Sequence, residues 1–323
     1  METRHSVYIA CKKNIDKNRL LDFTKSIISN KTPSFFKTNQ YTKRKNNKYN
    51  FSKCCEAFEE EFKSLDGDKF FELSWEKGYY FIESKKNEIP LKICMLLDEE
   101  LTERLRNDFE KVIVEDGIIA HEVNLRDSNI QNESFIDMLE YYGENADNYP
   151  KCKGTVNDVE IDIKKNPGYL YNIRGFMFGA LYRMWFGKES YEFFDKGLLR
   201  SFRCFENVEL GNDVTRITLY DNILDYNKKD YRDKQWAFRR ELQIDEIEKI
   251  LDEKSKEEQG HNVDSKVNIL EGEFEHGGSR LIQTFMKDGE IAYRSEADSV
   301  EERELDKDGN EVFYIVRKLQ KTN

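Results

Sequence analysis

Only a few reactive side chains in this sequence stand at spacings that catalysis or metal binding would need. His121 and Glu122 begin like the HExxH helix that holds zinc in metalloproteases, but position 125 is Leu where the second His ligand would stand. The other histidines lie in separate segments of the chain: His5, His261 and His276. The sequence therefore predicts no metal site.

Adjacent thiols at Cys54 and Cys55 are the next candidates for chemistry. A cysteine becomes a nucleophile when a neighbouring base or a helix N-terminus lowers its pKa, and only Ser52, at the start of a predicted helix, points to the second condition. We interpret the cysteines as reduced thiols, because none has CxxC spacing. The sequence shows no glycine-rich phosphate loop and no GxSxG nucleophile motif, so we expect no cofactor and assign no catalytic residue.

The segment RMWFGKESYEFF, residues 183–194, combines aromatic rings with Glu189 and Glu192. Trp185 and Phe186 continue an apolar stripe at helical spacing, which is typical of a buried core. The acidic residues are not paired with a histidine at a recognisable spacing, and we interpret them as a solvated face. An enzyme stays an alternative if its site is assembled from residues far apart in the chain, such as Glu189, Glu192 or His121.

Negative charge is concentrated at the C-terminal end of the chain. Residues 241–323 hold 22 Asp and Glu against 12 Lys and Arg, whereas residues 1–240 hold 41 against 40. An acidic surface repels nucleic acid and attracts basic proteins, although the same charge also keeps sheet edges from associating. The predicted partner-binding residues are glutamates of this region: Glu271, Glu273, Glu275, Glu301, Glu302 and Glu304.

Apolar periodicity predicts the elements that position these residues. Helices are predicted near residues 14–30, 52–67, 99–111, 134–144 and 231–242, and strands near residues 5–11, 69–84, 91–98, 155–163 and 213–222. The Asp116–Gly117 pair predicts a two-residue hairpin. Residues 168–187 carry apolar side chains at helical spacing for more than four turns, with Gly175 and Gly179 four residues apart, and predict the most buried helix of the protein.

Helices and strands mix without regular βαβ alternation, which favours an α+β fold. We predict a main domain over residues 1–258, with the aromatic-rich helix at its centre. Residues 259–323 hold short apolar runs separated by glycine-containing turns, at 277–278, 288–289 and 308–309. This pattern predicts an acidic antiparallel β-meander that packs on the main domain.

The N-terminal sequence has no basic start followed by an apolar stretch of secretory length. The most apolar segment, residues 168–187, contains Arg174 and Arg183, and each would cost about 2.5 to 3.5 kcal/mol at the centre of a bilayer. We therefore expect a cytoplasmic protein that does not bind membranes.

The segment YNIRGFMFGALYRMWFGKESYEFFDKGLLRSF, followed by ITLYDN, resembles cytoplasmic immunity proteins encoded beside bacterial polymorphic toxins. The resemblance covers residues 1–255 and rests on an aromatic segment that ends in Trp-Phe-Gly, while the C-terminal meander departs from the compact single-domain pattern. It implies a protein that binds and blocks a toxin, with no catalytic residue.

The leading hypothesis is a proteinaceous inhibitor whose acidic C-terminal surface binds a basic protein partner, such as a toxin nuclease, and not nucleic acid directly. A phage-encoded inhibitor of a bacterial defence enzyme would use the same physics. The alternative classes are the enzyme with a dispersed site and a structural subunit of a larger assembly. A deep pocket lined by titratable groups would favour the enzyme, and a flat acidic surface would favour the inhibitor.

Overall fold

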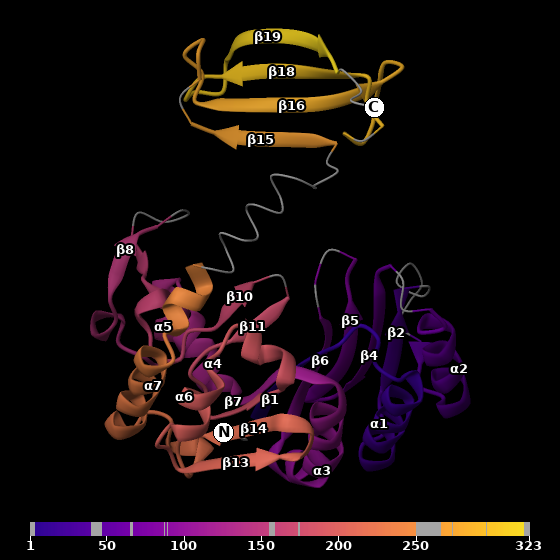
Figure 1. Cartoon of the computed structure of the whole chain (residues 1–323), viewed down its shortest axis with the longest axis vertical. Coiled ribbons are helices and arrows are strands. Elements are labelled where there is room, and N and C mark those ends of the chain that lie inside the picture. Colours follow the sequence, from indigo (N-terminus) through magenta and orange to yellow (C-terminus); the bar gives the residue numbers. More distant parts are fainter. Residues whose placement is uncertain are drawn as a thin grey trace. The chain divides into compact units, whose positions relative to one another are not determined.

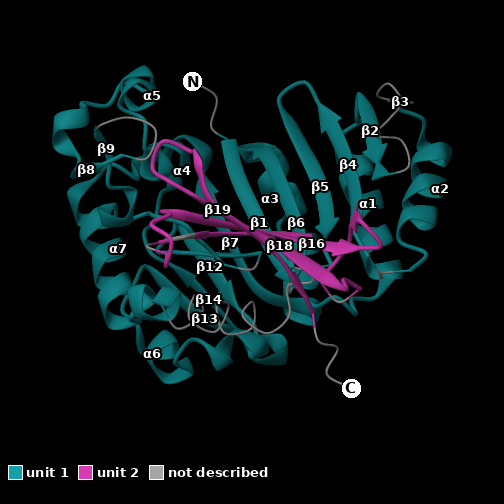
Figure 2. Cartoon of the chain, turned by 90° about the horizontal axis from the view of Figure 1, so that it is seen from above, with its two compact units in different colours: residues 1–252 teal, residues 253–323 magenta. Residues whose placement is uncertain are grey.

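The computed structural model describes residues 4–39, 47–64, 67–86, 88, 90–154, 159–173, 175–249, 266–272, 274–294 and 296–319. The chain divides into two compact units, Met1–Asp252 and Glu253–Asn323, which Figure 2 colours separately. Unit 1 is built from helices and strands, and unit 2 from antiparallel strands, so the fold is α+β as predicted. The expected packing of the second unit on the first stays a prediction.

Unit 1 is organised around a ten-stranded antiparallel sheet with the order β13-β14-β12-β7-β1-β6-β5-β4-β2-β3 (Figure 1). Its strands are β1 (Arg4–Cys11), β2 (Phe35–Thr38), β3 (Asn47–Lys48), β4 (Lys69–Trp75), β5 (Gly78–Ser84), β6 (Leu91–Asp98), β7 (Gly117–Asn124), β12 (Arg183–Phe186), β13 (Glu206–Leu210) and β14 (Val214–Thr218). Successive residues of a strand point to opposite faces. On β1, Val7 and Ile9 accordingly belong to one core and Tyr8 to another.

Three helices pack on the Val7 face: α1 (Lys17–Asn30), α2 (Phe51–Glu61) and α3 (Glu99–Asp116). Each begins close to its predicted start, and the side chains of Asp16, Asn50 and Asp98 accept hydrogen bonds from backbone N–H groups of the first turn. The cap of α2 is thus Asn50, and Ser52, expected at the start of this helix, lies within its first turn. The hairpin predicted at Asp116–Gly117 is wrong. Helix α3 continues to Asp116, and Gly117 begins β7.

The Tyr8 face is covered by residues 125–249, which form a second core. The elements there are α4 (Leu125–Asn132), α5 (Ile136–Tyr141), α6 (Lys196–Ser201), α7 (Lys229–Glu241), the hairpin β8 (Lys151–Lys153) with β9 (Val159–Ile161), the hairpin β10 (Tyr171–Ile173) with β11 (Phe176–Phe178), and the 3-10 helices η2 (Ala146–Asn148), η3 (Ile163–Lys165), η4 (Lys188–Glu192), η5 (Gly211–Asp213) and η6 (Ile223–Asp225). Figures 1 and 2 show α6 and α7 at one end of unit 1, and α1 and α2 at the other.

The aromatic-rich central helix predicted over residues 168–187 is wrong. The structure has three short strands there, β10, β11 and β12. Gly175 adopts a φ of 90° in the turn between β10 and β11, a conformation that a helix excludes. The prediction that Trp185 and Phe186 are core residues is confirmed, since their exposed fractions are 0% and 1%. A continuous apolar run satisfies a helix and a buried strand equally well.

Unit 2 is the antiparallel meander that the sequence predicts. Its strands are β15 (Val267–Glu271), β16 (Arg280–Lys287), β17 (Glu290–Ile291), β18 (Ser299–Leu305) and β19 (Glu311–Lys318), in the order β15-β16-β18-β19, with β17 paired to β16. Asp288 and Gly289 both have positive φ, as a tight two-residue hairpin turn requires. Among the described residues of this unit, the buried members of the core cluster are Phe285, Ala297 and Val300.

Candidate functional site

The six glutamates predicted to bind a partner do not form one surface. Glu273 and the side chain of Glu271 lie outside the described residues, and Glu275 is exposed in the turn after β15. Glu301, Glu302 and Glu304 belong to β18, where alternation places Glu301 on one face of the sheet and the other two on the opposite face.

Glu304 is only 5% exposed and organises the turn between β15 and β16. Its carboxylate lies 2.8 Å from Nδ1 of His276 and accepts the backbone N–H groups of His276 at 3.1 Å and Gly278 at 3.4 Å. The His276 ring stacks on Phe313, with 3.6 Å between ring centroids. Burial alone would raise the pKa of Glu304, but these hydrogen bonds lower it. The expectation that Glu304 is a surface residue for a partner therefore does not fit the structure.

The other two glutamates of β18 also have partners within unit 2. Glu302 accepts a hydrogen bond from Nε2 of Gln283 at 2.7 Å and lies 2.9 Å from Nε of Arg317. On the other face of the sheet, Glu301 lies 3.4 Å from Nη2 of Arg303. The acidic side chains of β18 are thus matched by cations or amides, and they do not resemble a row of free phosphate-like charges.

One face of unit 2 instead combines apolar and charged side chains in two rows that cross all four long strands. The first row is Ile269, Ile282, Arg303 and Tyr314, and the second is Val267, Thr284, Glu301 and Val316. We call these eight residues the two-row face. Its outer members keep large exposed fractions: 60% for Ile269, 42% for Val267, 46% for Tyr314 and 52% for Val316.

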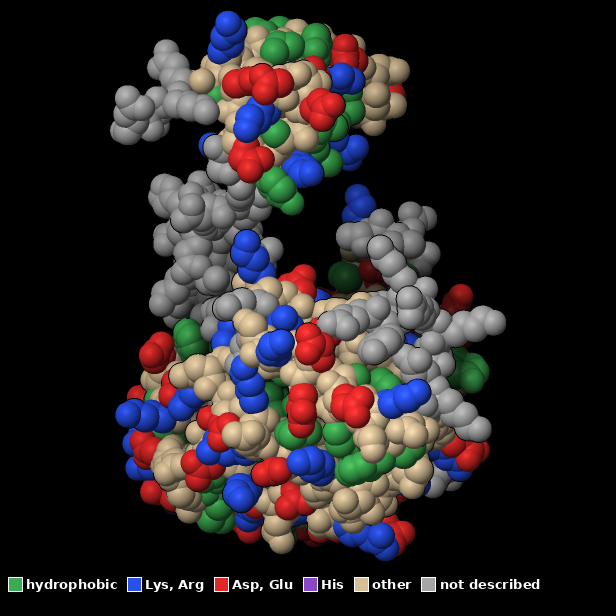
Figure 3. Space-filling model, turned by 90° about the vertical axis from the view of Figure 1, so that its right-hand side faces the viewer, with side chains coloured by type: hydrophobic (Ala, Val, Ile, Leu, Met, Phe, Trp, Pro, Cys, Tyr) green, Lys and Arg blue, Asp and Glu red, His purple; other side chains and the backbone are tan. Residues whose placement is uncertain are grey.

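The centre of the two-row face is polar, with the guanidinium of Arg303 lying 5.3 Å from the centre of the Tyr314 ring and beside Glu301. Figure 3 shows hydrophobic side chains at the surface of unit 2 among charged ones. Figure 3 also shows acidic and basic side chains interspersed on the visible face of unit 1. The two-row face therefore combines exposed apolar side chains on its two outer strands with an ion pair between them.

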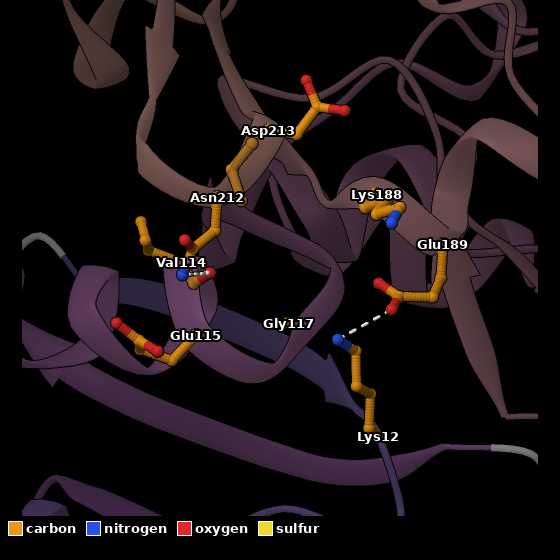
Figure 4. A pocket seen from close by; sticks show the side chains of 9 residues that line it. Lys12, Val114, Glu115, Gly117, Lys188, Glu189, Asn212 and Asp213 are labelled. Atoms are coloured by element: carbon orange, nitrogen blue, oxygen red, sulfur yellow. Dashed lines mark hydrogen bonds and ion pairs between the residues drawn. The ribbon is translucent and has the colours of Figure 1, made fainter.

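Unit 1 contains a polar cavity of about 450 Å³ at one end of its sheet (Figure 4). It is lined by Lys12, Val114, Glu115, Gly117, Lys188, Glu189, Asn212, Asp213 and Val214. Nζ of Lys12 lies 2.7 Å from Glu189, and the side-chain amide of Asn212 donates to the carbonyl of Val114 at 3.2 Å. The segments that follow β1 and β12, the end of α3 and the turn between β13 and β14 meet here.

The carboxylates of this cavity are matched by cations. Asp213 lies 2.5 Å from Nζ of Lys196 and 2.7 Å from Nη2 of Arg200. The hydrogen bond from Lys196 and the charges of both cations lower the pKa of Asp213 below its ordinary value. A carboxylate held ionised in this way is a weak proton acceptor, so Asp213 is better suited to binding a polar group than to acting as a general base.

The three residues considered for a dispersed catalytic site are not brought together. Glu189 lines the polar cavity and Glu192 is exposed on η4. His121 is buried on the Tyr8 face, where its ring stacks on Tyr8 with 5.1 Å between centroids. Burial lowers the pKa of His121 to about 3, so the ring is neutral.

The remaining reactive side chains, Cys54 and Glu122, are buried in the fold. Burial raises the pKa of the Cys54 thiol to about 12, so it is not a nucleophile near neutral pH. Glu122, on the Val7 face, is fully buried between His5, Arg106 and Arg183, at 2.7, 2.9 and 2.8 Å. In the part of the chain that the structure describes, no group of three or more His, Cys, Asp or Glu is placed to hold a metal ion.

Sequence reasoning missed both surfaces described above. Lys12 and Lys188 are far apart in the sequence and belong to no recognisable motif, and only the Gly211-Asn212-Asp213 turn signals the end of a strand. The two-row face needs the strand register, which alternation by itself does not provide. Among the described helices, none is long and apolar enough to cross a membrane.

No protein-family model, curated protein or solved structure matches this chain. The resemblance to immunity proteins therefore stays an expectation. The functional assignment rests on the geometry of the two-row face and of the polar cavity.

Proposed function

We propose that this chain is a proteinaceous inhibitor of the immunity type, which binds and blocks a partner protein through the two-row face of unit 2. The observation that carries the proposal is the exposure of Ile269, Val267, Tyr314 and Val316, at 42% or more each, on one face of a folded sheet. They form one exposed apolar pair on β15 and another on β19, and exposed apolar groups beside polar ones are typical of interaction sites.

The composition of the face supports a protein as the ligand. Tyrosine and arginine are among the residues that most often dominate binding energy in protein interfaces, and Arg303 of β18 contacts Tyr314 of the edge strand β19 on this face. A flat sheet surface offers no enclosed volume for a small molecule. Apolar contacts made by Ile269, Val267 and Val316 would provide the affinity.

The charge of unit 2 has a different role in this proposal. Residues 253–323 hold 17 Asp and Glu against 11 Lys and Arg, a net charge of −6. Such a field accelerates the encounter with a basic partner, more than it strengthens the bound complex. Mimicry of phosphate charge gains no support from the glutamates of β18, which are divided between two faces and paired.

Neighbouring residues of β15 provide a matched test. Ile269 lies on the two-row face and Leu270 on the opposite face, with exposed fractions of 60% and 47%. The full chain and its Leu270→Asp variant should capture the same stoichiometric partner from a lysate of the source cell, and Ile269→Asp should lose it. Undiminished capture by a folded Ile269→Asp variant would contradict the proposed surface.

The captured partner then decides between versions of the inhibitor. Its activity should fall when the purified chain is added, and a toxin or a host defence enzyme would distinguish immunity from phage anti-defence. A partner that keeps full activity when saturated would reject inhibition while leaving binding intact.

The second candidate is an enzyme that uses the polar cavity of unit 1. The cavity volume of about 450 Å³ lies in the range of small-molecule sites, and Glu189, Lys12 and Lys188 line it. A thermal-shift screen of polar metabolites tests this function. A ligand that stabilises the chain but not its Glu189→Gln variant would favour the enzyme, and no stabilisation by any metabolite would favour the inhibitor.

A further inference from the structure

The outer edge of β19 is unusually apolar for a strand at the end of a sheet. Five consecutive residues are apolar, from Val312 to Val316, and the strand is eight residues long. In the described part of unit 2, no strand pairs with this edge. Long exposed apolar edges are templates for pairing with another chain, and proteins ordinarily protect them with charges, proline or short strands.

The backbone hydrogen bonds between β18 and β19 show which residues of β19 direct their N–H and C=O groups toward this edge. The N–H of Leu319 donates to the carbonyl of Asp298 on the β18 side. Backbone direction alternates along a strand, so residues 317, 315 and 313 also bond to β18. Tyr314 and Val316 therefore direct their N–H and C=O groups outward, and the alternation ends at Val312, where the register with β18 shifts by one residue.

We propose that the partner of this edge is a second copy of the chain, paired antiparallel through β19 in a symmetric dimer. A two-fold axis perpendicular to the sheet places one residue opposite its own copy, and where this pair exchanges backbone hydrogen bonds, the residue directs its N–H and C=O groups outward. Tyr314 lies at the centre of the apolar run and directs its N–H and C=O groups outward, so we place the axis at this residue. The axis at Tyr314 defines every other pair.

This register is complementary along the strand. Phe313 falls opposite Ile315, and Val312 opposite Val316, so apolar and aromatic residues meet across the new pair. At the ends of the run, Glu311 of each copy falls opposite Arg317 of the other copy. Opposite charges thus close both ends of the apolar run.

The other edge of the sheet lacks this complementarity. A symmetric pair of β15 strands, centred on Ile269, would place Val267 opposite Glu271 and Asn268 opposite Leu270. Each of these pairs joins an apolar residue to a polar or charged one. The sequence of the two edges therefore selects β19.

The dimer extends the two-row face without depending on the proposed function. Tyr314 ends the first row at the β19 edge, so pairing joins that row to the same row of the second copy. The face would double in width, and an inhibitor built this way would present two equivalent partner sites. The dimer stands or fails in the absence of any partner protein.

Cysteine cross-linking tests the register. Paired residues that exchange backbone hydrogen bonds have Cα atoms about 5.5 Å apart, within the range of about 4.4 to 6.8 Å that disulfides span. A full-length Tyr314→Cys chain should form a covalent dimer under mild oxidation. The background variant Cys152→Ser removes the exposed native thiol.

Val316→Cys in the same background is the matched control. Val316 is as exposed as Tyr314, but the register places it opposite Val312, about 14 Å from its own copy at roughly 3.4 Å per residue. It should stay uncross-linked. Equal cross-linking of both variants would overturn the register.

Mass measurements in solution test the dimer itself. Multi-angle light scattering of the full chain at micromolar concentration should give twice the monomer mass. Val316→Pro should halve this mass, because proline removes an outward N–H and is tolerated at a free edge. Ile269→Pro, the same change at the β15 edge, should remain dimeric.

Two results would overturn the proposal. One is a monomeric wild-type chain, which would leave the β19 edge without a second copy. The other is a dimer that survives Val316→Pro in a variant whose circular dichroism shows a folded chain, because the dimer would then use another surface.

Discussion

Units 1 and 2 differ in where they place their apolar residues. Unit 1 buries both faces of its central strand β1 under separate cores, and Trp185, Tyr8 and Phe109 are fully enclosed. The core cluster of unit 2 contains three buried residues, and Ile269 and Tyr314 remain exposed. Burial of apolar surface is the main source of folding free energy, so unit 1 has the larger source of stability, and the proposed function assigns the exposed apolar side chains of unit 2 to a partner.

The two units also differ in how they use charged residues, which are either buried among partners or placed beside exposed side chains. Glu122 in unit 1 is enclosed by cations beneath α3 and stabilises the fold. On β18 of unit 2, Glu304 is used in the same way, whereas Glu301 lies beside exposed residues of the two-row face. Four substitutions test this contrast, from the most damaging to the mildest.

Trp185→Ala should have the largest effect. Trp185 is 0% exposed, packs edge-on against Phe109 and donates from Nε1 to Glu110 at 3.1 Å. Removal of a buried tryptophan costs about 3 to 5 kcal/mol, which urea denaturation followed by circular dichroism would measure. Trp236→Ala, at a half-buried position of α7, is the control and should cost less. Equal losses would show that unit 1 is not held together by this core.

Glu122→Gln should come next and should change the pH dependence. Burial alone would raise the pKa of Glu122, but the hydrogen bond with His5 and the charges of Arg183 and Arg106 outweigh it and lower the pKa to about 2. The stabilisation is therefore complete above the ordinary carboxyl pKa and is lost as pH falls from about 5 to 2. We expect unit 1 to lose about 3 kcal/mol at pH 7.

Acid titration of the wild-type chain and the Glu122→Gln variant checks the predicted direction of this pH dependence. The wild-type unfolding free energy should fall steeply below pH 5, and the Glu122→Gln variant should show a shallower fall from a lower starting value. Parallel curves would mean that Glu122 is not the group responsible.

Glu304→Gln should lower the melting temperature of unit 2 by several degrees. The amide cannot accept all the hydrogen bonds that His276 and Gly278 make to the carboxylate. Differential scanning calorimetry of the full chain would show the loss in the unit 2 transition and none in unit 1. Glu302→Gln is the control on the same face, and an equal shift would remove the special role assigned to the buried carboxylate.

Glu301→Gln should have the smallest effect on stability, within about 0.5 kcal/mol, because its ion pair with Arg303 is partly exposed. Its effect should appear in kinetics, since loss of a negative charge slows association with a basic partner and weakens the salt dependence. Stopped-flow association at two ionic strengths measures this. Unchanged kinetics would remove electrostatic steering from the proposal.

Much of the local structure follows from the sequence. Asp16 and Asp98 predict helix starts because their side chains cap backbone N–H groups, and the Asp288–Gly289 turn predicts a hairpin of the meander. The helix predicted over residues 168–187 fails because almost every residue there is apolar. A helix and a buried strand then have the same pattern, and only the neighbouring strands β7 and β14 decide.

The sequence by itself determined the α+β class, the position of the meander, the burial of Trp185 and the excess of negative charge near the C-terminus. Each of these depends on composition or on residues close together in the chain. Only the tertiary structure decided that Glu304 is buried, that Glu301 faces away from it, and that the outer edge of β19 has no strand beside it within the described residues. Those properties depend on strand register and strand order, which are set by contacts between residues far apart in the sequence.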